Sequence, residues 1–150
     1  MKEQDLTSTE FSHFQQLLCS TFELEIKDYY LALRISDISF NGVSLIRYKR
    51  ASELSSLNTE NIKPNEIHFY SKTEIHEIFD LFRHFRNCAS HSHRIKKIID
   101  KCSTYLKFID KDKSNTTMFG IIEEQLFYDF FNYIMTEAKT KRIKKLIFKQ

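Results

Sequence analysis

Apolar side chains recur every three or four positions along four stretches of the chain, a spacing that gives an α-helix one apolar face. Residues 9–34 predict a long core helix, and residues 75–85 predict a second helix. Residues 95–109 are interpreted as a further amphipathic helix, and a last helix is predicted from Ile121 to at least Ala138. The pattern therefore predicts a mainly helical chain.

The segments between these stretches carry turn and capping signals. Asn41-Gly42 between alternating apolar residues is a hairpin signal, but residues 45–57 also fit a short helix, and we expect a turn followed by a helix. Residues 58–70 hold the only proline and are interpreted as a connecting loop, while residues 110–117 predict a polar loop or a hairpin tip. Ser71-x-x-Glu74 has the spacing of a capping box and predicts the start of the second helix.

Composition supports the same interpretation. The chain has 150 residues, with two Gly, one Pro and fourteen Phe, which favours one domain with few enforced turns and a bulky apolar core. The predicted fold class is all-α: a single domain, residues 1–150, built as a bundle of four to five helices with room for a short hairpin. Three cysteines without CxxC spacing and no apolar leader predict a cytoplasmic protein, and the acidic residues within 118–135 argue against a membrane span.

Positive charge is concentrated in two blocks although the net charge is only +3. No acidic residue occurs between Leu81 and Ile99, and none follows Glu137 in the basic tail, residues 139–150. Both blocks are candidates for contact with phosphate, and such a tail would raise RNA affinity without reading sequence. Solvated helix faces are the alternative interpretation of both blocks.

Helical phase distinguishes the residues of the first block. Arg86 continues the apolar stripe of the second helix, and His91 lies on the inward stripe of the segment that follows it. By the same count His84 and His93 face solvent. Arg86 and His91 would diverge by about 140° on one helix, so a shared site requires a bend near residues 87–90 or a second chain.

The stretch "RNCASH", residues 86–91, resembles the R-x4-6-H signature of the HEPN superfamily, including the polar residue after the arginine, here Asn87. The longer "RNCASHSHRI" is similar to stretches of abortive-infection-type HEPN proteins. The resemblance implies an all-helical fold and a metal-independent endoribonuclease without cofactors, in which Arg and His of two protomers form a composite site at a homodimer interface. It also implies RNA as partner, a role as a bacterial toxin or in phage defence, and an antitoxin or regulatory partner protein.

On that resemblance each residue of the block receives an expected role. His91 would act as general base or acid, Arg86 would hold the scissile phosphate, and Asn87 would orient the phosphate or the histidine. The product would be a 2′,3′-cyclic phosphate. The expected substrate-binding residues are Arg83, His93, Arg94 and Lys97.

Several alternatives stay open at this point. A non-catalytic HEPN domain that binds RNA or serves in dimerisation and docking is one. A structural role is another, with Arg86 paired to a carboxylate such as Glu123 or Asp129 and His91 capping the next helix. Zinc binding by Cys88, His84, His91 and His93 lacks the spacing of common zinc sites, and nothing in the sequence indicates an oxyanion hole for a nucleophilic Cys88.

Overall fold

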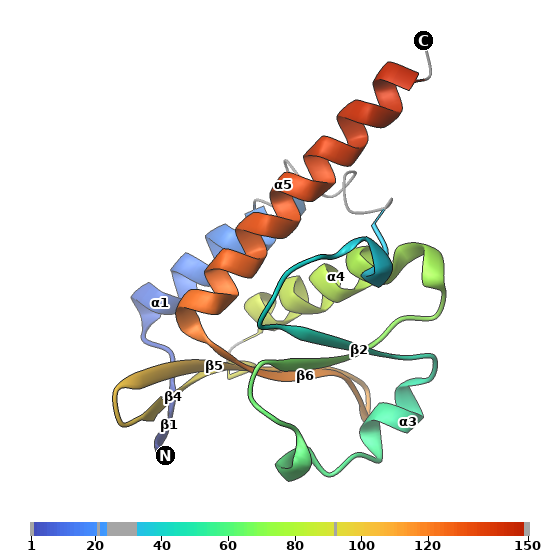
Figure 1. Cartoon of the computed structure of the whole chain (residues 1–150). Helices are drawn as coiled ribbons and strands as arrows, with labels where there is room; N and C mark the ends of the chain where they lie inside the picture. Colours follow the sequence, from blue (N-terminus) through green and yellow to red (C-terminus); the bar gives the residue numbers. More distant parts are fainter. Residues whose placement is uncertain (1, 21, 24–32, 92, 149–150) are drawn as a thin grey trace.

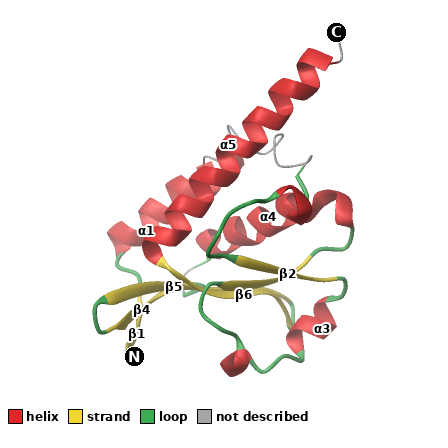
Figure 2. Cartoon of the chain, in the orientation of Figure 1, coloured by secondary structure: helices red, strands yellow, loops and turns green. Residues whose placement is uncertain are grey.

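The protein is built on a six-stranded mixed β-sheet with helices on both faces, seen in a computed structural model (Figures 1 and 2). The structure describes residues 2–20, 22–23, 33–91 and 93–148, with the backbone alone for 141–148. The strands are β1 Lys2–Asp5, β2 Ser44–Tyr48, β3 Glu66–Tyr70, β4 Ile95–Asp100, β5 Ser103–Asp112 and β6 Asn115–Glu123. The α-helices are α1 Ser8–Phe14, α3 Ala51–Ser55, α4 Glu77–Ser90 and α5 Glu124–Phe148.

The order of strands across the sheet is β1-β4-β5-β6-β3-β2. Only β2 and β3 run parallel, and the other neighbouring strands are antiparallel. Helices α1, α4 and α5 cover one face, here called the helical face, and α3 lies against β6, β3 and β2 on the other, here called the open face (Figure 1). The predicted all-α bundle is therefore wrong, and with it the all-helical layout that the HEPN resemblance implies.

The largest error concerns residues 95–109, predicted as helix, which form β4 and most of β5, two strands of the antiparallel run that β6 completes. Leu106, Phe108 and Asp110 alternate inward with a period of two, which is the strand period. The turns joining these strands hold neither Gly nor Asn-Gly. Lys101 and Lys113 take the required positive φ, at 54° and 57°, so the usual hairpin signal was missing. The hairpin-tip interpretation of residues 110–117 is confirmed.

Other predicted elements are corrected in part. The Asn41-Gly42 turn leads first into β2 and only then into α3, and the supposed loop 58–70 ends in β3. Ser71 does not cap a helix, because its hydroxyl donates to Asp80 and to the carbonyl of Thr73. A single 3₁₀ turn, Glu74–His76, precedes α4, and the last helix begins at Glu124 rather than Ile121.

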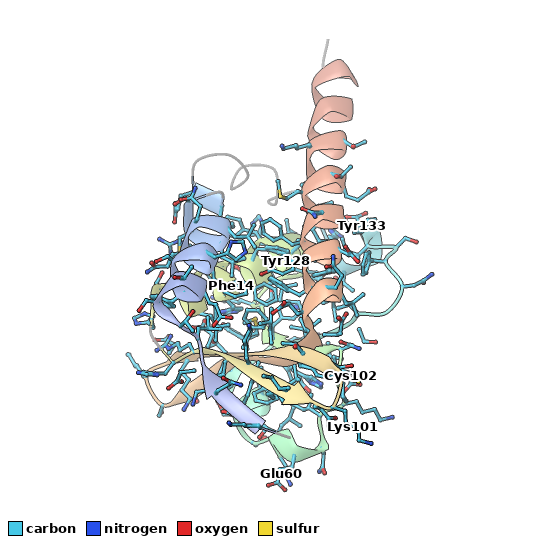
Figure 3. All side chains as sticks on the ribbon, turned by 90° about the vertical axis from the view of Figure 1, so that its left-hand side faces the viewer. Phe14, Glu60, Lys101, Cys102, Tyr128 and Tyr133 are labelled. Carbon is cyan, nitrogen blue, oxygen red and sulfur yellow. The ribbon has the colours of Figure 1, made fainter. Side chains whose placement is uncertain are left out.

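The predicted first helix begins one residue early, at Ser8. Thr7 caps it in a reciprocal capping box with Glu10. The chain continues from α1 into a π-helical segment, Gln15–Ser20, and the rest of the predicted helix includes residues 24–32, which lie outside the described residues. Phe14 packs against Tyr128, so α1 is attached to the start of α5 (Figure 3).

Phenylalanine supplies most of the large buried side chains between the sheet and the helical layer. The ring of Phe108 on β5 lies 4.9 Å from Phe85 on α4 and 5.0 Å from Phe127 on α5, measured between ring centroids. Phe108 is fully buried, so it is the point where the sheet meets both helices.

We expect Phe108→Ala to lower the free energy of unfolding by about 3–5 kcal/mol, because it removes a ring from the contact of three elements and leaves a cavity. Ile99→Ala, on β4 and 42% exposed, is the control and should cost under about 1 kcal/mol. Urea denaturation of both variants measures the difference. Equal destabilisation would contradict this account of the core.

Candidate functional site

Arg83 and Asn87 lie four positions apart on α4, and His91 follows directly after its end. Residues four apart lie above one another on a helix, so Arg83 and Asn87 form a polar stripe beside the apolar face that packs on the sheet, and His91 extends it beyond the helix. The helix ends at Ser90, and His91 is its C-cap with extended backbone. Residues 87–90, where a bend was predicted, are therefore regular helix, and the change of direction comes only at His91.

This stripe borders a surface pocket of about 460 Å³ at one end of the sheet, called here the first pocket. Its residues come from α4, from the turn before β4, and from the ends of β3, β5 and β6. The lining consists of Tyr70, Arg83, His84, Asn87, His91, Arg94, Asp110, Lys111, Asp112 and Thr117.

Asp110 lies at the base of the first pocket and is only 2% exposed. Its Oδ2 accepts hydrogen bonds from Thr117 Oγ1 at 2.9 Å and Asn87 Nδ2 at 3.5 Å, and lies 2.9 Å from His84 Nδ1. Its Oδ1 accepts from an Arg94 guanidinium nitrogen at 2.9 Å. The strand register shifts after Asp110 and leaves Thr117 as an extra residue of β6, within reach of the carboxylate.

The electrostatics of Asp110 follow from these contacts. Burial by itself raises the pKa of this carboxyl, but the hydrogen bond and charge of His84, with the hydrogen bonds from Thr117 and Asn87, lower the pKa overall. Asp110 is therefore ionised at neutral pH. A buried carboxylate without such partners would be strongly destabilising.

The prediction that His84 faces solvent is wrong. Its side chain is only 4% exposed, and both ring nitrogens have hydrogen-bond partners. Besides the contact with Asp110, its Nε2 donates to the carbonyl oxygen of Tyr70 at 2.7 Å. Both partners accept hydrogen bonds, so neither ring nitrogen is left for a ligand. Glu77, at the start of the same helix, is also buried. Helical phase did not predict this burial, because α4 is covered both by the sheet and by the segment Gln15–Ser20.

The predicted site residues divide into two groups. Asn87, His91, Arg83 and Arg94 all line the first pocket. The other three do not line it, and each pairs with an acidic residue of the N-terminal segment. Arg86 pairs with Glu23, His93 Nδ1 lies 3.2 Å from Asp5, and Lys97 pairs with Glu10.

Within one chain, Arg86 and His91 therefore do not meet in the first pocket. Arg86 does bind a carboxylate, but its partner is the exposed Glu23, whereas the structural alternative expected a buried carboxylate such as Glu123 or Asp129. His91 does not cap a following helix, because the next element is the strand β4. The composite arrangement across two chains stays a prediction.

The pairing also changes the interpretation of the first basic block. Lys96 lies between Glu3 and Asp5, and the lowered pKa values of both carboxyls reflect hydrogen bonds from Lys107 to Glu3 and from His93 to Asp5. Acidic residues distant in the sequence thus neutralise much of the positive charge of a segment that itself contains no acidic residue. Within the described part of the chain, the Lys111 ammonium in the first pocket has no carboxylate partner.

Cys88 is buried in the core beneath this polar face. Burial, together with the nearby charge of Asp110, raises the pKa of its thiol well above the ordinary value, which is unsuited to a nucleophile.

Among the described residues no three His, Cys, Asp or Glu side chains are grouped to hold a metal ion. No described helix combines the length and apolar character needed to cross a bilayer.

Comparison of the chain with protein-family models, curated proteins and solved structures gave no match.

Sequence reasoning missed six residues of the pocket lining: Tyr70, His84, Asp110, Lys111, Asp112 and Thr117. A signal for Asp110 was present, because it follows Leu106 and Phe108 at a spacing of two, the inward positions of a strand. Interpreting the segment as helix removed that signal. Tyr70 and Thr117 carry no pattern that separates them from other strand residues.

We expect Asp110→Asn to lower the free energy of unfolding by about 3 kcal/mol at neutral pH, because His84 and Arg94 lose their anionic partner. The folded pKa of Asp110 lies below the ordinary value of 3.8, so its stabilisation is present above that pH and is lost as the pH falls through the folded pKa. The difference in free energy of unfolding between wild type and variant should therefore have its full size above about pH 5 and become smaller in stronger acid. Asp112→Asn, at an exposed neighbour on the same strand, is the matched control, and urea denaturation across this pH range is the measurement. A gap that stays constant down to the lowest pH would contradict the assignment.

Proposed function

We propose that the protein binds RNA and that the first pocket holds a backbone phosphate. The observation that carries the proposal is the meeting of Arg83, His91, Arg94 and Lys111 in one open pocket from three separate segments. Guanidinium and ammonium groups are the usual phosphate ligands in proteins, and Arg adds a planar pair of donors.

The charge balance in the pocket supports an anionic ligand. Its two carboxylates, Asp110 and Asp112, face three permanent cations, and Asp110 is already bound by His84 and Arg94. Arg83 is half-exposed, and although it pairs with Asp80 at 3.2 Å, such exposed pairs are weak and exchange readily for a phosphate. Lys111 supplies the least compensated charge.

Acceptors beside the cations favour RNA over DNA. The carboxylate of Asp112 and the amide oxygen of Asn87 line the same pocket and can accept a hydrogen bond from a ribose 2′-hydroxyl. That hydroxyl is the group by which a protein distinguishes the two nucleic acids. A phosphate held by the cations would place the adjoining ribose near these acceptors.

We expect Lys111→Gln and Arg83→Gln each to weaken binding of a fluorescently labelled single-stranded RNA of about ten nucleotides by about three- to tenfold. Lys101→Gln makes the same change at an exposed side chain in the turn between β4 and β5, at the far end of that hairpin from the pocket (Figure 3), and should leave the affinity unchanged. Fluorescence anisotropy at a fixed low salt concentration measures all three. Equal affinities for the Lys111 and Lys101 variants would refute the pocket as the phosphate site.

Cleavage of the bound RNA is the second candidate, favoured by the position of His91. Its side chain is exposed at the pocket rim, and within the described ranges no side chain forms a hydrogen bond with its imidazole. Among the described residues its ring nitrogens are therefore available to a substrate hydroxyl, as a general base requires, whereas those of His84 are occupied by Asp110 and the Tyr70 carbonyl.

The chemistry needs no metal ion. His91 removes the proton from a 2′-hydroxyl, the 2′-oxygen attacks the adjacent phosphorus, and the bond to the 5′-oxygen breaks while water protonates that oxygen. The product carries a 2′,3′-cyclic phosphate. Arg83, Arg94 and Lys111 stabilise the additional negative charge of the pentacoordinate phosphate.

We expect wild-type protein to shorten RNA in the presence of EDTA and His91→Gln to slow that cleavage by about 10²–10⁴-fold with binding retained. His76→Gln, at an exposed histidine before α4, is the control and should cleave normally. Arg86→Gln tests the composite site, since loss of cleavage there requires a second chain to bring Arg86 to the pocket. Denaturing gels with analysis of the product ends measure cleavage. If RNA is bound but never cut, cleavage is refuted and RNA binding remains as the proposed function.

A toxin or phage-defence role, a regulatory partner protein, a homodimer and a cytoplasmic location stay predictions from the sequence. The described cysteines are all free thiols, which is consistent with a reducing compartment.

A further inference from the structure

A second pocket of about 280 Å³ adjoins the first and shares two of its residues, Arg94 and Lys111. It lies on the open face of the sheet, where Lys96 of β4 and Lys107 of β5 contribute to its lining. Glu3 of β1 is its single carboxylate among the lining residues. The two pockets therefore meet at a common wall of two cations, at the end of β5.

Strand register explains how the two lysines come together. Lys96 and Lys107 are directly paired across β4 and β5, so their side chains leave the same face at neighbouring positions. Two like charges in this arrangement repel each other. Glu3 relieves the repulsion, with its carboxylate oxygens 3.5 Å from Lys96 Nζ and 3.1 Å from Lys107 Nζ.

This arrangement is an anion site occupied by a side chain of the protein itself. One carboxylate bridges two ammonium groups, as a phosphate would. Strand β1 has four exposed residues and pairs with β4 alone, so Glu3 sits on a sheet edge. Its ion pairs are partly exposed and hence weak, which allows an incoming anion to displace it.

We propose that the second pocket is a subsite for the neighbouring phosphate of the same RNA strand, and that Glu3 competes with that phosphate. The inference rests on the proposed function of the first pocket and extends it. The substrate class becomes an extended single strand that passes from the helical face to the open face around Arg94 and Lys111, rather than a mononucleotide. Successive phosphates of one strand are the anions that two adjoining basic pockets can take together.

The test uses the full-length protein with two probes, uridine monophosphate and an oligouridylate of about eight nucleotides. We expect Glu3→Gln to tighten binding of the oligonucleotide by about two- to fivefold, because the competing carboxylate is removed. Lys107→Gln should weaken it by a similar factor and reduce the salt dependence of log K by about 0.7, one phosphate contact fewer. Neither variant should alter the affinity for uridine monophosphate.

Matched controls carry the same charge changes at distant positions. Glu60→Gln lies in the segment between α3 and β3, and Lys101→Gln lies in the β4–β5 turn (Figure 3). Both should bind the oligonucleotide like wild type. Thermal unfolding of each variant shows whether a change in affinity reflects a change in folding.

The outcomes separate the two proposals. Oligonucleotide binding that depends on Lys111 but is unchanged by Glu3→Gln and Lys107→Gln would overturn the second subsite and leave the first pocket standing. Equal affinity for the mononucleotide and the oligonucleotide would also overturn it. Failure of wild-type protein to bind either probe would overturn the proposed function, and the subsite with it.

Discussion

The buried carboxylate of Asp110 is the constraint on which the arrangement around the pocket depends. An ionised carboxylate in a protein interior is costly unless its oxygens are fully hydrogen-bonded. Asp110 meets that requirement with donors from α4, from the residue before β4 and from β6. Those contacts join the helix to three neighbouring strands at one end of the sheet. The position of α4, and hence of the stripe containing Asn87 and His91, follows from satisfying this one charge.

The apolar core and the polar network share the same helix. Phe85 of α4 packs on Phe108 of β5, and two residues further along that strand Asp110 binds His84, the neighbour of Phe85. The helix is thus held by its apolar side along its length and by a charged contact at its middle, at His84. A polar contact of this kind adds orientation to a hydrophobic interface that by itself is non-directional. Arg83, Asn87 and Asp110 are consequently positioned by a helix and a strand, while His91 and Arg94 come from the turn before β4.

Charge compensation decides which part of the basic block remains open to a ligand. The N-terminal residues Glu3, Asp5 and Glu10 cover cations of β4 and β5, and Glu23 covers Arg86. Among the cations of the first pocket, Lys111 at the end of β5 has no carboxylate partner within the described residues, and it lines both pockets. A protein with a net charge of +3 therefore presents a local, shaped anion site at this end of the sheet. Such a site suits the recognition of individual phosphates along a strand.

The helical periods of α4 and α5 and the polar turn near residue 113 could be predicted from the sequence, and so could four residues that line the first pocket, Arg83, Asn87, His91 and Arg94. Those features are local, since a helical period, a polar tip or a basic motif can be recognised within one segment. The strands of residues 95–123 could not be predicted, because their turns lack glycine and because burial on a sheet outweighs local helical spacing. Only the tertiary structure decided that His84 is buried and Arg86 is paired with Glu23, since their partners lie 26 and 63 residues away in the chain. Long-range pairing carries no signature in a single sequence.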